Sequence, residues 1–328
     1  MFHINKQGDR FTLLCLTDPQ LNNSNFGEKS KYSVLEYTVK TLVERVKPDL
    51  IAIAGDLSHA NHTLAYEKTG ELFDSLGVPW TFCFGNHDMQ KGDEPSREVV
   101  RLYEGHKNLL FEAGDPALGV GNFAVKIDLF GRPAEALILM DSHHLEKYKN
   151  PDGTERDVNA RLTPLQVEWY KNTAERLKAE GYLDSTLMLH IPITAYRDAA
   201  KAAFKEGIDK KAVTIAEAYA GDCWNEGYKD SFGVQHEGLG IHPDTDGVFE
   251  AIKQIGTTKN VVAGHDHINC TSINYCGVRL TYCLKTGAGY SWKPKMSGGT
   301  VLEINKDGVY KIYHEFADAT HLLEGTDF

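Results

Sequence analysis

The sequence lacks the long apolar runs that mark membrane-spanning helices. No run approaches the about 18 residues needed to cross a bilayer, and the apolar stretch at residues 11–16 is too short for the core of a signal peptide. The six cysteines form no Cys-x-x-Cys pair, and Cys15 and Cys83 fall inside apolar runs, as buried free thiols usually do. We therefore expect a cytoplasmic protein with reduced thiols and no membrane association.

Basic residues are also fewer than acidic ones. The chain has 35 Lys and Arg against 46 Asp and Glu, a formal net charge of −11, whereas proteins that bind nucleic acids generally carry a basic surface. An acidic chain can still bind an anionic substrate where metal ions supply local positive charge. The composition therefore argues against general nucleic-acid binding, leaves small anionic substrates open, and says nothing of the oligomeric state.

The first 90 residues alternate between apolar runs and segments of helical periodicity. Strands are predicted at residues 11–17, 50–54 and 80–84, separated by helices at residues 33–47 and before Gly77. This order predicts parallel strands covered by helices. The later sequence predicts a helix from Thr163 to about Glu180 and strands at residues 122–129, 135–140, 186–189, 260–263, 278–284, 300–304 and 308–315.

The segment at about residues 196–246 has a different composition, Ala-rich at first and then rich in Gly, Trp and His. We interpret it as a cap or loop insertion in a single domain that spans residues 1–328. Long loops of this kind carry specificity, so side chains in it and nearby could shape a substrate pocket, namely Trp224, His236, Glu237 and Tyr290.

Polar clusters directly follow five of the predicted strands. They are Asp18 with Gln20, Gly55-Asp56, Gly85-Asn86-His87-Asp88, His190, and Gly264-His265-Asp266-His267. Because the carboxyl ends of parallel strands form the binding crevice of an open sheet, we expect the clusters to meet at one site. Carboxylate, amide and imidazole groups suit two metal ions chosen among Mn, Fe, Zn and Mg, and Asp56 could bridge ions about 3.5–4 Å apart.

In this order the clusters resemble the calcineurin-like metallophosphoesterases, over roughly residues 11–304. The Pro48-Asp49-Leu50 lead-in, residues 264–269 and residues 285–290 resemble the purple-acid-phosphatase-like branch related to a yeast dosage-dependent cell-cycle regulator. The resemblance implies an α/β fold of the four-layer α+β type, in which two packed mixed β-sheets are flanked by helices.

The resemblance also implies a role for each matching residue. The first metal would be held by Asp18, Gln20, the bridging Asp56 and His267, and the second by Asp56, Asn86, His190 and His265. His87 would assist as a catalytic acid, and Asp88 could orient it by a hydrogen bond. The implied activity is a metal-dependent phosphoesterase that hydrolyses small phosphomonoesters or phosphodiesters by a metal-bound hydroxide.

Gln20 departs from the family pattern, which is Asp-x-His. An amide oxygen is a weaker ligand than imidazole and favours harder ions such as Mn²⁺, Mg²⁺ or Fe. Purple acid phosphatases instead take a tyrosine three residues after the bridging Asp, where this chain has His59. Either Gln20 or His59 could complete the first site, and we favour Gln20.

A second function is compatible with the same fold. A non-catalytic, metal-dependent interaction module could keep the architecture and lose turnover, because fold alone does not determine function. The intact Asn86-His87-Asp88 motif argues against it, since a scaffold has no need of a positioned acid beside the metals.

Overall fold

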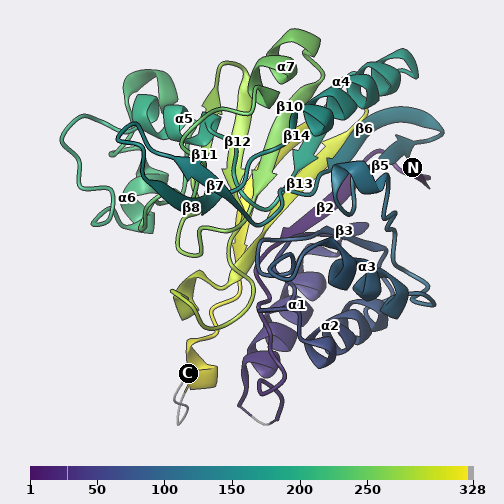
Figure 1. The fold of residues 1–328 in the computed structure, drawn as a ribbon. Helices are drawn as coiled ribbons and strands as arrows, with labels where there is room; N and C mark the ends of the chain where they lie inside the picture. The colour runs from purple at the N-terminus through teal and green to yellow at the C-terminus, as the bar shows by residue number, and fades with distance from the viewer. Residues whose placement is uncertain (28, 324–328) are drawn as a thin grey trace.

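The computed structural model describes residues 1–27 and 29–323, which form two large β-sheets packed face to face with helices on their outer sides (Figure 1). The first sheet has five strands in the order β14 (Gly308–Phe316), β13 (Gly298–Asn305), β2 (Phe11–Leu16), β3 (Leu50–Ala54) and β4 (Trp80–Cys83). The second has seven, in the order β1 (Phe2–Lys6), β5 (Phe123–Leu129), β6 (Arg132–Leu139), β9 (Ser185–Met188), β10 (Thr258–Ala263), β12 (Val278–Tyr282) and β11 (Ser272–Tyr275). The predicted fold class is confirmed.

Strands β2, β3 and β4 are parallel, and α1 (Lys31–Val46) and α2 (Thr63–Ser75) connect them. Strand β3 is buried along its whole length because both of its faces are covered. Ile51 and Ile53 share a hydrophobic cluster with residues of α1 and α2, whereas Ala52 and Ala54 share one with the seven-stranded sheet. A strand with two buried faces reads as a continuous apolar run, which is how the sequence predicted it.

The outer face of the seven-stranded sheet is covered by α4 (Pro164–Ala179), α5 (Ala195–Ala203) and α7 (Val248–Ile255) (Figure 1). The predicted start of α4 is confirmed: Thr163 caps the helix, Pro164 is its first residue, and Gln166 completes a reciprocal capping box. The predicted strands are all present, with ends that differ by up to three residues.

Several elements were not predicted from the sequence. These are β1, α3 (Asp93–Leu102), α7, β11, and the antiparallel hairpin of β7 (Leu145–Lys149) and β8 (Glu155–Asn159). Within residues 196–246 the structure has most of α5, the short α6 (Ile215–Ala220) and loops. That this segment is a cap in a single domain stays a prediction.

All six cysteines are free thiols, and Cys15 and Cys83 are fully buried, as their place in apolar strands predicted. Within residues 1–27 and 29–323, none of the helices combines the length and the apolar character that crossing a membrane requires. The cellular location stays a prediction.

Candidate metal centre

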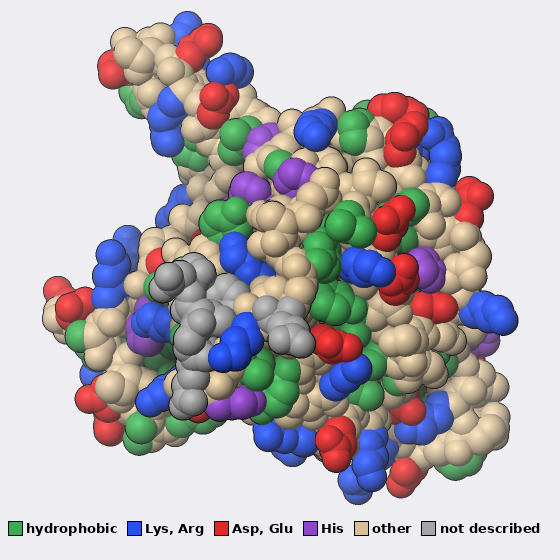
Figure 2. Space-filling view, turned by 90° about the horizontal axis from the view of Figure 1, so that it is seen from below, with side chains coloured by type: hydrophobic (Ala, Val, Ile, Leu, Met, Phe, Trp, Pro, Cys, Tyr) green, Lys and Arg blue, Asp and Glu red, His purple; other side chains and the backbone are tan. Residues whose placement is uncertain are grey.

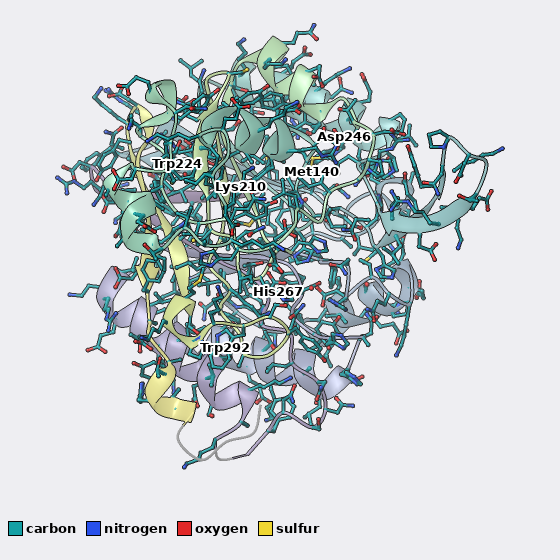
Figure 3. The ribbon with its side chains drawn as sticks, turned by 90° about the vertical axis from the view of Figure 1, so that its left-hand side faces the viewer. Met140, Lys210, Trp224, Asp246, His267 and Trp292 are labelled. Atoms are coloured by element: carbon teal, nitrogen blue, oxygen red, sulfur yellow. The ribbon has the colours of Figure 1, made fainter. Side chains whose placement is uncertain are left out.

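The predicted site residues follow strands of both sheets and lie together where the carboxyl ends of those strands meet. Asp18, Asp56 and Asn86 follow β2, β3 and β4, whereas His190 and His265 follow β9 and β10. Ligand atoms of Asp18, Asp56 and His190 lie within 4.8 Å of one another, and all three side chains are buried. In Figure 3, His267 lies near the centre, between the pale purple N-terminal ribbon and the green ribbon of the other sheet.

One group of ligand atoms surrounds the amide oxygen of Asn86. This Oδ1 lies 3.0 Å from His190 Nε2 and 2.9 Å from His265 Nδ1, and His190 Nε2 is 3.4 Å from Asp56 Oδ2. His190 Nδ1 donates to the carbonyl of Ala54 at 2.7 Å, which leaves Nε2 free to act as a ligand. Two imidazole nitrogens, an amide oxygen and a carboxylate oxygen suit Mn, Fe or Zn, so these residues fit a metal ion.

The electrostatics of this group favour a cation. Burial alone would lower the pKa of His190, but the Asp56 and Asp18 carboxylates outweigh it and raise the pKa to about 9. Burial likewise acts to raise the pKa of Asp56, but His190 lowers it to about 2. In the absence of a metal a proton on His190 therefore balances the buried carboxylates, and an ion that binds there displaces it.

The second group of ligand atoms centres on Asp18. Its Oδ1 is buried without a hydrogen-bond partner and lies 3.3 Å from His267 Nε2, while His267 Nδ1 donates to the carbonyl of Tyr290. Gln20 turns its amide nitrogen towards this group, 2.8 Å from Asp56 Oδ2 and 3.1 Å from His267 Nε2. Its amide oxygen faces away and accepts from the ammonium of Lys285 at 2.6 Å.

Lys285 is a site residue whose role sequence reasoning missed. Its ammonium is buried, with the backbone carbonyl of Asp18 at 3.3 Å as a second acceptor. Burial lowers the pKa of Lys285 to about 8, against the opposing effect of the Asp18 and Asp56 carboxylates. The residue was noted in the sequence only as part of a family-like run, since nothing local indicates that the loop after β12 returns beside Asp18.

His87 lies beside the ligand atoms, and its orientation comes from a residue that was not predicted. Its Nε2 is 3.9 Å from Asp56 Oδ2, and its Nδ1 is 2.6 Å from Nε2 of Gln90. The hypothesis that Asp88 orients His87 is wrong for this structure. The Asp88 carboxylate is buried and accepts hydrogen bonds from the Tyr66 hydroxyl and from the backbone N–H groups of Leu57, Ser58 and Gly85, so it holds two strand-end loops together.

The alternative ligand His59 lies at the rim of the site. Its ring stacks on Tyr290, with ring centroids 4.6 Å apart and ring planes 9° apart. The centroid of its ring also lies 4.3 Å from that of the His87 ring. The Lys31 ammonium lies 4.7 Å from the centroid of the Tyr290 ring. The ring contacts of His59 are thus with Tyr290 and His87, and its role as a metal ligand or a substrate contact stays a prediction.

The other suggested pocket residues have mixed surroundings. Trp224 is fully buried, donates to the carbonyl of Ala218, and lies well away from His267 in Figure 3, so it belongs to the core. His236 contacts the carbonyl of Val213. Glu237 accepts from the backbone N–H of Ile268 at 2.7 Å, so of these residues it lies next to the loop that carries His265 and His267.

Asn159, at the end of β8, was not predicted as a site residue. Its amide group lies 2.9 Å from His265 Nε2 and 2.9 Å from the carbonyl of Gly240. In Figure 3 the hairpin that carries it is the teal ribbon projecting on the right of the view. The contact of the Asn159 amide nitrogen with Nε2 holds the His265 ring in place.

The backbone of the site is held in an uncommon conformation. Asp18, Gln20, Asp56 and His265 all have positive φ, at 54°, 45°, 55° and 74°, a region that costs free energy for residues other than glycine. Gly85 is required for another reason, because a Cβ atom there would fall 2.2 Å from Asp56 Oδ1. Close approach of two strand ends therefore brings Asp56 and Asn86 together.

Two known proteins are similar to this chain in sequence. "Probable inactive purple acid phosphatase 14" of Arabidopsis thaliana is 24% identical over 272 residues, covering 74% of this chain and 59% of its own length. A "Probable cyclic nucleotide phosphodiesterase" of Psychrobacter arcticus is 22% identical over 177 residues, covering 51% of this chain and 56% of its own length. The chain thus spans less than two thirds of these relatives.

The fold is shared with a dimetal phosphatase from Danio rerio. The two structures have a TM-score of 0.54 at 12% identity, over 94% of this chain and 99% of the other. Residues 11–269 match the family described as calcineurin-like phosphoesterase, a span that holds every predicted metal ligand. Five strand-end clusters around one buried site and this match together show that the chain belongs to the calcineurin-like phosphoesterase family.

Proposed function

We propose that the protein is a metal-dependent phosphoesterase. The observation that carries the proposal is the approach of Asn86 Oδ1 to within 3.0 Å of His190 Nε2 and 2.9 Å of His265 Nδ1, next to the Asp56 carboxylate. A buried set of oxygen and imidazole ligands is costly to maintain without an ion. Family membership gives the set its chemistry, which is hydrolysis of phosphate esters.

Each residue of the site would have its own role in the reaction. Asp56, Asn86, His190 and His265 would hold an ion, which would polarise a phosphoryl oxygen and lower the pKa of a bound water. His87 would hydrogen-bond the leaving-group oxygen through its Nε2–H and stabilise the negative charge that develops there, with Gln90 holding the ring by its Nδ1. A second ion beside Asp18 and His267 is the arrangement that the family resemblance implies.

The substrate we propose is a small phosphate ester, a monoester or a diester. His59 and Tyr290 offer stacked rings beside His87, and Lys31 at the end of this stack supplies positive charge. On the face shown in Figure 2, basic side chains are interspersed with acidic ones rather than forming a continuous basic surface. We also propose the purple-acid-phosphatase-like branch related to the yeast cell-cycle regulator, on the strength of residues 264–269 and 285–290.

A non-catalytic, metal-dependent module is the second candidate. It is favoured by the name of the Arabidopsis relative, "Probable inactive purple acid phosphatase 14". It would retain the ion-binding residues and lack turnover on every ester.

The test is hydrolysis of p-nitrophenyl phosphate and bis-p-nitrophenyl phosphate with Mn²⁺, Zn²⁺, Fe²⁺ or Mg²⁺. We expect metal-dependent turnover that Asp56→Asn abolishes. His87→Ala should keep its metal content and slow turnover by about 10²-fold or more, most for alkyl esters with poor leaving groups. Bound metal without turnover on either ester would favour the module, and loss of metal from His87→Ala would refute the role of His87.

A further inference from the structure

The hydrogen bonds around Gln20 fix which end of its amide group faces the site. Lys285 has only donors, so the atom 2.6 Å from its ammonium must be the oxygen of Gln20. In the neutral ring of His267, Nδ1 donates to the Tyr290 carbonyl, so Nε2 is an acceptor. Asp56 is a carboxylate and also an acceptor. The only arrangement that pairs donors with acceptors throughout turns the nitrogen of Gln20 into the site.

In this orientation Gln20 cannot act as a metal ligand. An amide NH₂ group has two donors and no acceptor, and both donors are used, at 2.8 Å to Asp56 Oδ2 and 3.1 Å to His267 Nε2. These two atoms are the ones that a first metal ion would need. Turning the amide to present its oxygen would set the NH₂ group against the Lys285 ammonium in a buried place, where unpaired donors are costly.

The charge balance of the site also disfavours a second metal ion beside Asp18. The Lys285 ammonium lies beside two buried carboxylates, Asp18 and Asp56, so these three side chains together carry one net negative charge when Lys285 is protonated and His190 is neutral. A single divalent ion bound by Asn86 and its neighbouring ligands already exceeds this negative charge. A second divalent ion would lie next to the ammonium and the first ion, and Oδ1 of Asp18 would be the one carboxylate oxygen there without a hydrogen-bond partner. Like charges in a buried site repel strongly.

We propose that this chain binds a single metal ion, at Asp56, Asn86, His190 and His265, and that Gln20 and Lys285 together take the place of the first ion. Lys285 supplies the positive charge, and Gln20 ties Asp56 to His267 in the way a bridging ion would. This inference rests on the proposed metal site, and it departs from the dinuclear arrangement that the family resemblance implied for Gln20.

The decisive variant is Gln20→Glu, which exchanges the amide nitrogen for an oxygen and keeps the size of the side chain. One carboxylate oxygen of the new residue can still accept from Lys285, while the other faces Asp56 and His267 as an acceptor. Two facing carboxylates repel unless a cation or a shared proton lies between them, so with excess Mn²⁺ a second ion should bind. Lys285→Met is a second route to the same result, because it frees the Gln20 oxygen to turn inward.

The measurement is the metal content per chain after equilibration with Mn²⁺, together with the electron paramagnetic resonance spectrum. Wild type should hold one ion per chain and show the hyperfine pattern of isolated Mn²⁺. Gln20→Glu should hold two ions and show the exchange-coupled signal of a pair. The matched control is Lys178→Met, which removes an ammonium that also bonds a backbone carbonyl, that of Ile255, far from the site, and it should still hold one ion.

Other outcomes separate this inference from the proposed function. Two coupled ions in wild type would overturn the single-ion inference and leave the phosphoesterase proposal standing. One ion that Asn86→Ala retains would also overturn it, because the ion would then lie at the first position. One ion in both wild type and Gln20→Glu would refute the role given to Gln20. No ion in wild type would overturn the inference and the proposed function together.

Discussion

Among single residues, Glu135 in β6 shows how far the fold tolerates a buried acid. Its side chain is fully buried and accepts a hydrogen bond from Thr186 at 3.0 Å. Burial raises the pKa of Glu135 to about 8, with a smaller contribution from Asp184. The folded protein therefore keeps the proton over a pH range in which the unfolded chain has released it.

This predicts a pH-dependent loss of stability. Because the folded-state pKa lies above the unfolded value of about 4.3, the contribution of Glu135 is fully present below that value and is lost as the pH rises to about 8. The free energy of unfolding of Glu135→Gln should therefore gain about 2–3 kcal/mol on that of wild type as the pH rises from about 5.5 to about 7.5. Urea unfolding of both proteins measures this difference. The control is Glu168→Gln on the exposed side of α4. Parallel pH profiles for Glu135→Gln and wild type would contradict the prediction.

For single residues, the sequence could predict which side chains are candidate metal ligands, but it could not predict the hydrogen-bond partners that orient them. His190 and His267 are oriented by the backbone carbonyls of Ala54 and Tyr290, and His87 by Gln90. Every residue has a backbone carbonyl, so the amino-acid sequence does not show which carbonyl accepts a hydrogen bond from a histidine. Gln20 was recognised as unusual, yet its orientation depends on Lys285, 265 residues away in the chain.

Among the elements, the β7–β8 hairpin extends the site beyond the two large sheets. Its strands carry mostly exposed and charged residues, with Val158 the one buried residue in them. It has too little buried surface to give the alternating apolar signal of a half-buried strand, and this is why the sequence did not predict it. Strands β2, β3 and β4 were predictable because each is an apolar run with both faces covered.

The hairpin leads to a prediction for Asn159. Asn159→Leu removes the contact to His265 Nε2 and should weaken Mn²⁺ binding about 10-fold or more, because partners of ligating histidines typically contribute that much. Isothermal titration calorimetry measures the change. Asp157→Asn, on the exposed part of the same strand, should bind Mn²⁺ as wild type does. Equal affinity in the Asn159 variant would show that the hairpin is not needed to position His265.

At the scale of the whole molecule, the proposed ion joins the two sheets. Asp56 and Asn86 come from the five-stranded sheet, and His190 and His265 from the seven-stranded sheet. The sequence could predict that these clusters meet at strand ends, because parallel strands deliver their carboxyl ends to one edge. That the clusters divide between two separate sheets follows from packing over long sequence separations and is not visible in local pattern.

An ion that joins two sheets should stabilise the whole protein. Mn²⁺ at about 100 times its Kd should add about 2.7 kcal/mol to the free energy of unfolding, followed by urea unfolding with and without a chelator. Asn86→Ala should lose this gain, since its side chain supplies the central oxygen of the ligand group. Identical unfolding midpoints for metal-loaded and chelated wild type would contradict the proposed site.

The positive φ angles of Asp18, Asp56 and His265 have a consequence for how this sequence can change. Glycine adopts such angles freely, so at each of these positions the residue that suits the backbone best is one that cannot hold a metal. A library of random variants selected only for heat resistance should therefore drift towards glycine there. The same library selected for metal binding should keep the original residues, and the contrast between the two outcomes would mark the positions where function, rather than folding, determines the amino acid.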